Sequence, residues 1–145
     1  MEIKYQLFRE ENLLIQKFLG VFSLETHLRY HQFQMENEEF NQVQKVLIDL
    51  RDIHFELSIN IFREIMNHII SVRKNAVQQK SKSNNVQIVF WVNQPLTTVI
   101  AQQVKRSNPH LNYNYCAMKE NVVRILNLPP DLNLDEMIHN LENTY

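Results

Sequence analysis

The sequence predicts a single α/β domain over residues 1–145, built on a mixed five-stranded sheet with four to five helices. Short apolar runs alternate with longer amphipathic segments, which is the order expected of strands joined by helical crossovers. The first two apolar runs, 4–9 and 13–19, are separated by only three residues, the length of a hairpin connection. The sheet should therefore combine an N-terminal hairpin with parallel strands.

A first helix is expected after the hairpin. Ser23 precedes a segment whose apolar residues recur every three or four positions, so the helix should begin with Ser23 as its N-cap. It should end near Asn37, where the sequence becomes polar. Residues 46–50 are short, apolar and rich in β-branched side chains, which is typical of a strand covered on both faces in a parallel sheet.

The central part of the chain predicts a second helix, a loop and a fourth strand. Ser58 can cap a helix whose apolar stripe runs through residues 61–72. Residues 73–85 carry four Lys or Arg side chains and no acid, so we expect an exposed loop there. Residues 86–92 then form the fourth strand. Pro95 opens the next helix because proline is tolerated in the first helical turn.

The C-terminal part predicts one more strand and two helical segments. In residues 111–118, Tyr113 and Tyr115 share one face of an alternating pattern, which is typical of an edge strand with one buried face. Such an edge could support a homodimer through sheet extension. A helix over 120–128 must stop at two prolines. Residues 129–145 add a short amphipathic helix capped by Asn133 or Asp131.

Composition excludes several classes of protein. Fifteen Lys and Arg against sixteen Asp and Glu give a net charge of −1, whereas a nucleic-acid binder is usually basic. Gly20 is the only glycine, which excludes glycine-rich phosphate-binding loops. Cys116 is the only cysteine, so no intrachain disulfide and no paired-cysteine zinc site can form. With no long apolar stretch or leader, we expect a cytoplasmic protein without membrane contact, and no cofactor.

Candidate binding residues gather at the carboxyl ends of the expected strands. Asp49, Arg51 and Asp52 end the third strand, at the edge where open α/β sheets usually hold ligands. Their charges can orient a substrate or pair with one another and with the loop backbone. Residues Trp91, Asn93, Cys116 and Met118 end the next two strands and could line the same edge.

Two other polar positions each allow a plain and a functional interpretation. Ser58 lies where a helix begins, so it is either an N-cap or a site for an anionic oxygen or phosphate. His27 and His31 are four residues apart and can share a helix face. No third ligand is evident in the sequence, so amphipathic positions are expected and no metal site is.

The segment 46–55, followed by Ser58 and an apolar helix, resembles the central strand, loop and helix of the STAS family. The opening hairpin, the helix begun by Ser23-Leu24-Glu25 and the strand 86–92 resemble its SpoIIAA-like group of sporulation anti-sigma-factor-antagonist-like domains. The resemblance covers residues 1 to about 128. It implies a non-catalytic regulatory domain of bacterial type that binds a protein partner.

The resemblance also implies a recognition face and a partner. In the antagonists, the loop matching 56–60 reads Asp-Ser-Ser-Gly, and one serine is phosphorylated by a kinase-like anti-sigma factor. Here the loop reads Glu-Leu-Ser-Ile-Asn, so the Asp and the Gly are missing and either Ser58 or Ile59 takes the modified position. The loop from Asp52 to Asn60 and the following helix would contact the partner, with Ser58 as the possible phosphosite.

The alternative function is a binding module for a small apolar or anionic ligand, seated in a strand-end pocket between Ser58, Trp91 and Met118. The residues expected to bind a partner or ligand are Asp52, Ser58, Asn60, Trp91, Asn93 and Met118. An enzyme ranks last because no pair of nucleophile and base can be named in the sequence.

Overall fold

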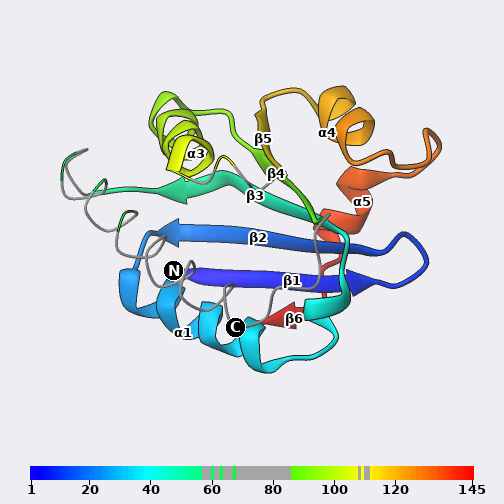
Figure 1. Ribbon diagram of the computed structural model, residues 1–145, viewed down its shortest axis with the longest axis horizontal. Coiled ribbons are helices and arrows are strands. Elements are labelled where there is room, and N and C mark those ends of the chain that lie inside the picture. Colours follow the sequence, from blue (N-terminus) through cyan, green and yellow to red (C-terminus); the bar gives the residue numbers. More distant parts are fainter. Residues whose placement is uncertain (57–59, 61–62, 64–66, 68–85, 108, 110–111) are drawn as a thin grey trace.

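A six-stranded mixed sheet runs through the part of the chain that the computed structural model describes, which is every residue except 57–59, 61–62, 64–66, 68–85, 108 and 110–111 (Figure 1). Its strands are β1 (Glu2–Phe8), β2 (Leu13–Val21), β3 (Lys45–His54), β4 (Gln87–Trp91), β5 (Asn112–Cys116) and β6 (Asn143–Thr144). They lie in the order β5-β4-β3-β2-β1-β6. The expected α/β class and mixed sheet are confirmed.

The N-terminal hairpin is present as predicted. β1 and β2 are antiparallel, with Phe8 opposite Leu13 at the turn. Asn12 takes the left-handed conformation in this turn, with φ at 52°. Its carbonyl oxygen accepts from the Lys45 N–H at 3.1 Å, and its side-chain oxygen accepts from the Gln44 N–H at 3.1 Å. The turn is therefore tied to the start of β3.

The strands β2, β3, β4 and β5 are parallel, and each lies beside the one before it. Because such crossovers are right-handed, successive steps in one direction place the connecting helices on the same face of the sheet. Helices α1 (Leu24–Glu36) and α3 (Pro95–Ser107) connect β2 with β3 and β4 with β5. The core beneath this face contains Phe18, Tyr30, Leu50, Ile53, Phe90, Val92, Ala101, Val104 and Tyr113.

Local signals for these two helices are confirmed. The Ser23 side chain accepts from the Thr26 N–H at 3.3 Å, as an N-cap does. Asn37 is the C-cap of α1, and Pro95 is the first residue of α3. Of the helix predicted after Ser58 the structure describes only Asn60, Arg63 and Asn67, each in helical conformation. The loop predicted over 73–85 lies outside the described residues.

The opposite face of the sheet is covered by α4 (Lys119–Ile125) and α5 (Leu134–His139), which lie at the other end of the molecule from α3 in Figure 1. Asn133 caps α5 by accepting from the Glu136 N–H at 3.3 Å. This second core contains Leu13, Ile15, Leu47, Val89, Trp91, Val122, Leu126, Leu134 and Ile138. No helix within the described ranges combines the length and the apolar character needed to cross a membrane.

The prediction of five strands was wrong, because a sixth strand closes the outer edge of β1. β6 pairs antiparallel with β1, placing Thr144 opposite Lys4. Ile3 and Tyr145 also exchange backbone hydrogen bonds of 3.3 and 2.8 Å. The two residues of β6 are polar and exposed, so no hydrophobic pattern marks them as a strand.

β5 lies at the opposite edge of the sheet, as predicted. Its two tyrosines are alternate residues and so point to the same face, but only Tyr113 is buried. Tyr113 is 3% exposed and packs against Phe90, whereas Tyr115 is 37% exposed. A homodimer through this edge stays a prediction.

Candidate functional site

The carboxyl ends of β3, β4 and β5 meet at one edge of the sheet, on the face covered by α4 and α5. The parallel register places Asp49 opposite Trp91, and Trp91 opposite Cys116. We call the side chains of Lys17, Asp49, Arg51, Asp52, Trp91, Lys119 and Asp135 the strand-end cluster. It includes all three charged residues that the sequence analysis places at the end of the third strand, Asp49, Arg51 and Asp52, which in the structure lie within β3.

The centre of the strand-end cluster is a pair between a buried acid and its neighbour on the same face of β3. Asp49 is fully buried. The Arg51 guanidinium donates to both of its oxygens, from Nε to Oδ1 at 2.9 Å and from Nη2 to Oδ2 at 2.8 Å. The Arg51 backbone N–H also donates to Oδ1, at 3.1 Å. Two parallel bonds of this kind fix orientation as well as charge.

The indole ring of Trp91 also contacts the Arg51 guanidinium. The guanidinium carbon lies 3.5 Å from the centroid of the indole ring, which is a close cation–π contact. The indole Nε1 donates to the Ala117 carbonyl at 3.0 Å. The hydrogen bond from Arg51 to Asp49 raises the pKa of the guanidinium above its ordinary value. Arg51 is therefore a fixed cation rather than a group that exchanges protons.

Two further ion pairs flank this centre. Lys17 lies 2.7 Å from Asp52, and Lys119 lies 2.6 Å from Asp135. The cluster thus contains three cations and three carboxylates, each with an opposite partner.

Cys116 lies beside this cluster at the end of β5. The thiol is buried, and burial raises its pKa to about 11. Since the thiolate is the nucleophilic form, the side chain is unreactive at neutral pH. Cys116 therefore offers no ready nucleophile at this edge of the sheet.

The sequence-predicted binding residues that the structure describes differ in exposure. Asp52, Asn60 and Asn93 are exposed, and Met118 is 60% exposed at the N-cap position of α4. Trp91, which was expected to line a strand-end pocket, is 3% exposed and stacks on the Arg51 guanidinium. Ser58 lies outside the described residues.

The two histidines on α1 do not belong to a metal cluster in the part of the chain described. His27 lies among aromatic rings, 6.2 Å from Phe18 and 5.9 Å from Phe22 between ring centroids. No group of three or more His, Cys, Asp or Glu side chains that could hold a metal ion is found among the described residues.

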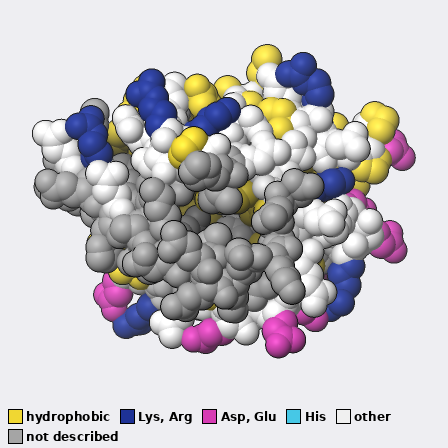
Figure 2. All heavy atoms as spheres, viewed as in Figure 1, with side chains coloured by type: hydrophobic (Ala, Val, Ile, Leu, Met, Phe, Trp, Pro, Cys, Tyr) yellow, Lys and Arg dark blue, Asp and Glu magenta, His cyan; other side chains and the backbone are white. Residues whose placement is uncertain are grey.

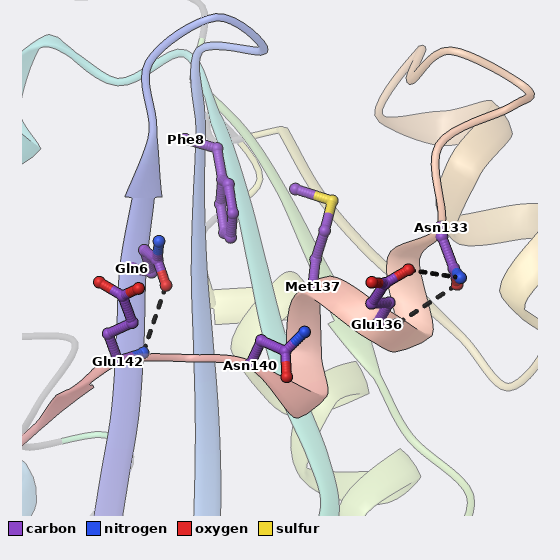
Figure 3. A pocket seen from close by; sticks show the side chains of 7 residues that line it. All are labelled: Gln6, Phe8, Asn133, Glu136, Met137, Asn140 and Glu142. Carbon is purple, nitrogen blue, oxygen red and sulfur yellow. Dashed lines mark hydrogen bonds between the residues drawn. The ribbon is translucent and has the colours of Figure 1, made fainter.

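A second candidate site, not expected from the sequence, is a hollow of about 380 Å³ between β1 and α5 (Figure 3). It is lined by Gln6, Phe8, Asn133, Glu136, Met137, Asn140 and Glu142. Figure 3 shows the end of the Met137 side chain turned toward the Phe8 ring, with Glu142 on one side of this pair and Glu136 on the other. The residues come from opposite ends of the chain, so no local motif could reveal the hollow.

Hydrogen bonds fix part of this lining. The Glu142 N–H donates to Gln6 Oε1 at 3.2 Å, which ties the C-terminal segment to β1. Asn133 Nδ2 donates to Glu136 Oε2 at 3.0 Å. The hollow is therefore bordered by side chains whose positions depend on the same contacts that close the sheet.

Comparison with known proteins does not assign this chain to a family. No protein-family model matches the sequence, and no curated protein matches it. The function has to be argued from the two sites themselves.

Proposed function

We propose that this protein is a non-catalytic regulatory domain that binds another protein through the surface around the strand-end cluster. The proposal follows the resemblance to the anti-sigma-factor antagonists and takes a kinase-like anti-sigma factor as the partner. One observation carries it: Met118, which is 60% exposed, directly precedes Lys119 of a cluster in which every charge is already paired.

The exposed apolar side chains come from three neighbouring elements. Val99 on α3 and Tyr115 on β5 are each 37% exposed, and Met118 at the start of α4 is 60% exposed. Figure 2 shows apolar side chains gathered along the top of the view, over β5 and between α3 and α4. Exposed apolar side chains that gather in one region favour a protein interface.

The paired charges favour a protein partner over a substrate. The Arg51 guanidinium already has both Asp49 oxygens and the Trp91 ring, so it has little capacity left for a small anion. Asp52 remains half exposed while it pairs with Lys17. Polar groups of this kind suit the rim of an interface around an apolar centre.

The test compares three baits in an affinity capture from a lysate of the source organism. Met118→Arg places a charge at the centre of the proposed surface, and Glu10→Arg is the matched control in the exposed turn at the other end of β2. We expect wild type and Glu10→Arg to retain a kinase-like ATPase and Met118→Arg to lose it. Purified partner should then bind Met118→Arg at least about 30-fold more weakly, as at an interface hot spot.

Ser58→Asp tests the switch that the resemblance implies. A phosphate adds a charge of about −1.5 to −2 at neutral pH, so we expect this variant to bind the purified ATPase more weakly than wild type. In the capture experiment, equal retention of the same proteins by wild type, Met118→Arg and Glu10→Arg would contradict the proposed surface. Capture of nothing specific by wild type would also contradict it. Unchanged affinity of Ser58→Asp would remove the switch alone.

A further inference from the structure

The hollow between β1 and α5 combines two acidic sides with an apolar middle. Phe8 and Met137 are partly buried and also pack against the core beneath α4 and α5. Glu136 and Glu142 are exposed and lie on either side of these two side chains in Figure 3. A ligand seated here would meet carboxylates at both ends and apolar surface between them.

The lining offers many hydrogen-bond acceptors and no cation. Its seven residues are two glutamates, three amides, Phe8 and Met137, which gives a formal charge of −2. Neither glutamate forms an ion pair with a described Lys, Arg or His side chain, and the nearby Lys119 already pairs with Asp135 at 2.6 Å. Charge complementarity therefore favours a ligand rich in positively charged N–H donors.

The arrangement fits an organic cation better than a metal ion. The two carboxylates are separated by Phe8 and Met137 rather than converging on a point. No metal-binding group of three side chains occurs among the described residues. An aromatic face and a polarisable thioether suit an alkyl chain and its ammonium ends, and a hollow of about 380 Å³ is large enough for such a molecule.

We propose that this hollow binds an aliphatic diamine, with one ammonium group at Glu136, the other at Glu142, and the methylene chain on Phe8 and Met137. This site is separate from the strand-end cluster and does not depend on the function proposed for it. Binding would add an ordered bridge between α5 and the segment that leads into β6.

The experiment uses the full chain labelled at its methionine methyl groups and titrated with putrescine, the four-carbon diamine. We expect the Met137 methyl signal, assigned with Met137→Leu, to shift in a saturable manner. Glu136→Gln and Glu142→Gln should each weaken binding about tenfold, because each removes one charge-assisted contact. Glu38→Gln, an exposed acid in the loop after α1, is the control and should bind like wild type.

Two ligand controls complete the test. Butylamine has the same chain with one ammonium group, and it should bind about tenfold more weakly than putrescine. The remaining methionine signals report whether each variant is folded. The proposal is overturned if the Met137 signal does not move, if butylamine binds as well as putrescine, if magnesium produces the same shift, or if the hollow variants bind like Glu38→Gln.

Discussion

Asp49 and Arg51 form a closed pair on β3, in which a fully buried carboxylate receives both of its side-chain contacts from a residue two positions later. Alternate residues of a strand point to the same face, so the pairing follows directly from strand geometry. The stack of Arg51 on Trp91 then carries the contact across to β4. The pair thus links two parallel strands at the edge where the proposed interface lies.

Replacing one residue of this pair should destabilise the fold more than replacing both. Arg51→Met leaves the Asp49 carboxylate buried without its partner, and we expect a loss of about 3 kcal/mol in the free energy of unfolding. That figure is at the low end for buried pairs because the Arg51 side chain is 25% exposed. Asp49→Leu combined with Arg51→Met should recover most of the loss, since an apolar pair needs no compensating charge.

Urea unfolding of wild type, both single variants and the double variant measures this coupling. Simple additivity of the two single effects would show that Asp49 and Arg51 contribute independently. The geometry would then matter less for stability than their contacts suggest.

The Cys116 thiol should make stability fall at high pH. Burial raises its pKa to about 11 from an ordinary value of 9.0, so the stabilising contribution is complete below pH 9. Between these two values only the unfolded chain loses the proton, and the free energy of unfolding should fall by up to about 1.4 kcal/mol per pH unit. Cys116→Ala should show a shallower fall in this range when unfolding is followed from pH 8 to pH 11. An identical slope in wild type and variant would show that other groups cause it.

The Tyr30 hydroxyl contributes nothing by hydrogen bonding among the described residues. Tyr30 is 1% exposed, and its hydroxyl has no hydrogen-bond partner in that part of the chain. Burial, with a smaller effect of Tyr5, raises its pKa above the ordinary value. Tyr30→Phe should therefore leave the free energy of unfolding unchanged or raise it by up to about 1 kcal/mol. The melting temperature should accordingly stay the same or rise. A lower melting temperature for Tyr30→Phe would reveal a bond from outside the described residues.

Much of the fold could be predicted because its signals are local. The hairpin needed two β-rich runs and a short connection, and the Ser23 cap and Pro95 start needed one residue each. β6 could not be found in this way, because Asn143 and Thr144 are a strand only by pairing with Lys4 and Tyr5. A two-residue strand of polar side chains has no periodicity to read.

The two candidate sites also differ in whether local sequence signals could reveal their residues. Asp49, Arg51 and Asp52 could be assigned to one strand and its carboxyl side from sequence, but the expected strand end at residue 50 was wrong, because β3 continues through all three residues to His54. The burial of Trp91 could not, because it depends on the register between β3, β4 and β5. The hollow joins Phe8 of β1 to Met137 of α5, and only the closed sheet brings these two residues together.

Gly20 and Asn127 both adopt positive φ, and their substitutions should have opposite effects. Gly20 has φ at 78°, and a side chain there would meet no atom within 4 Å. Gly20→Ala should therefore cost about 1 kcal/mol through backbone strain alone. Asn127, at 48°, ends the turn after α4, and Asn127→Gly should be neutral or slightly stabilising because glycine adopts this conformation without strain. Chemical unfolding of both variants checks the pair. A loss much larger than about 1 kcal/mol in Gly20→Ala would mean that the end of β2 contacts residues outside the described part of the chain, since no described atom is close enough to clash.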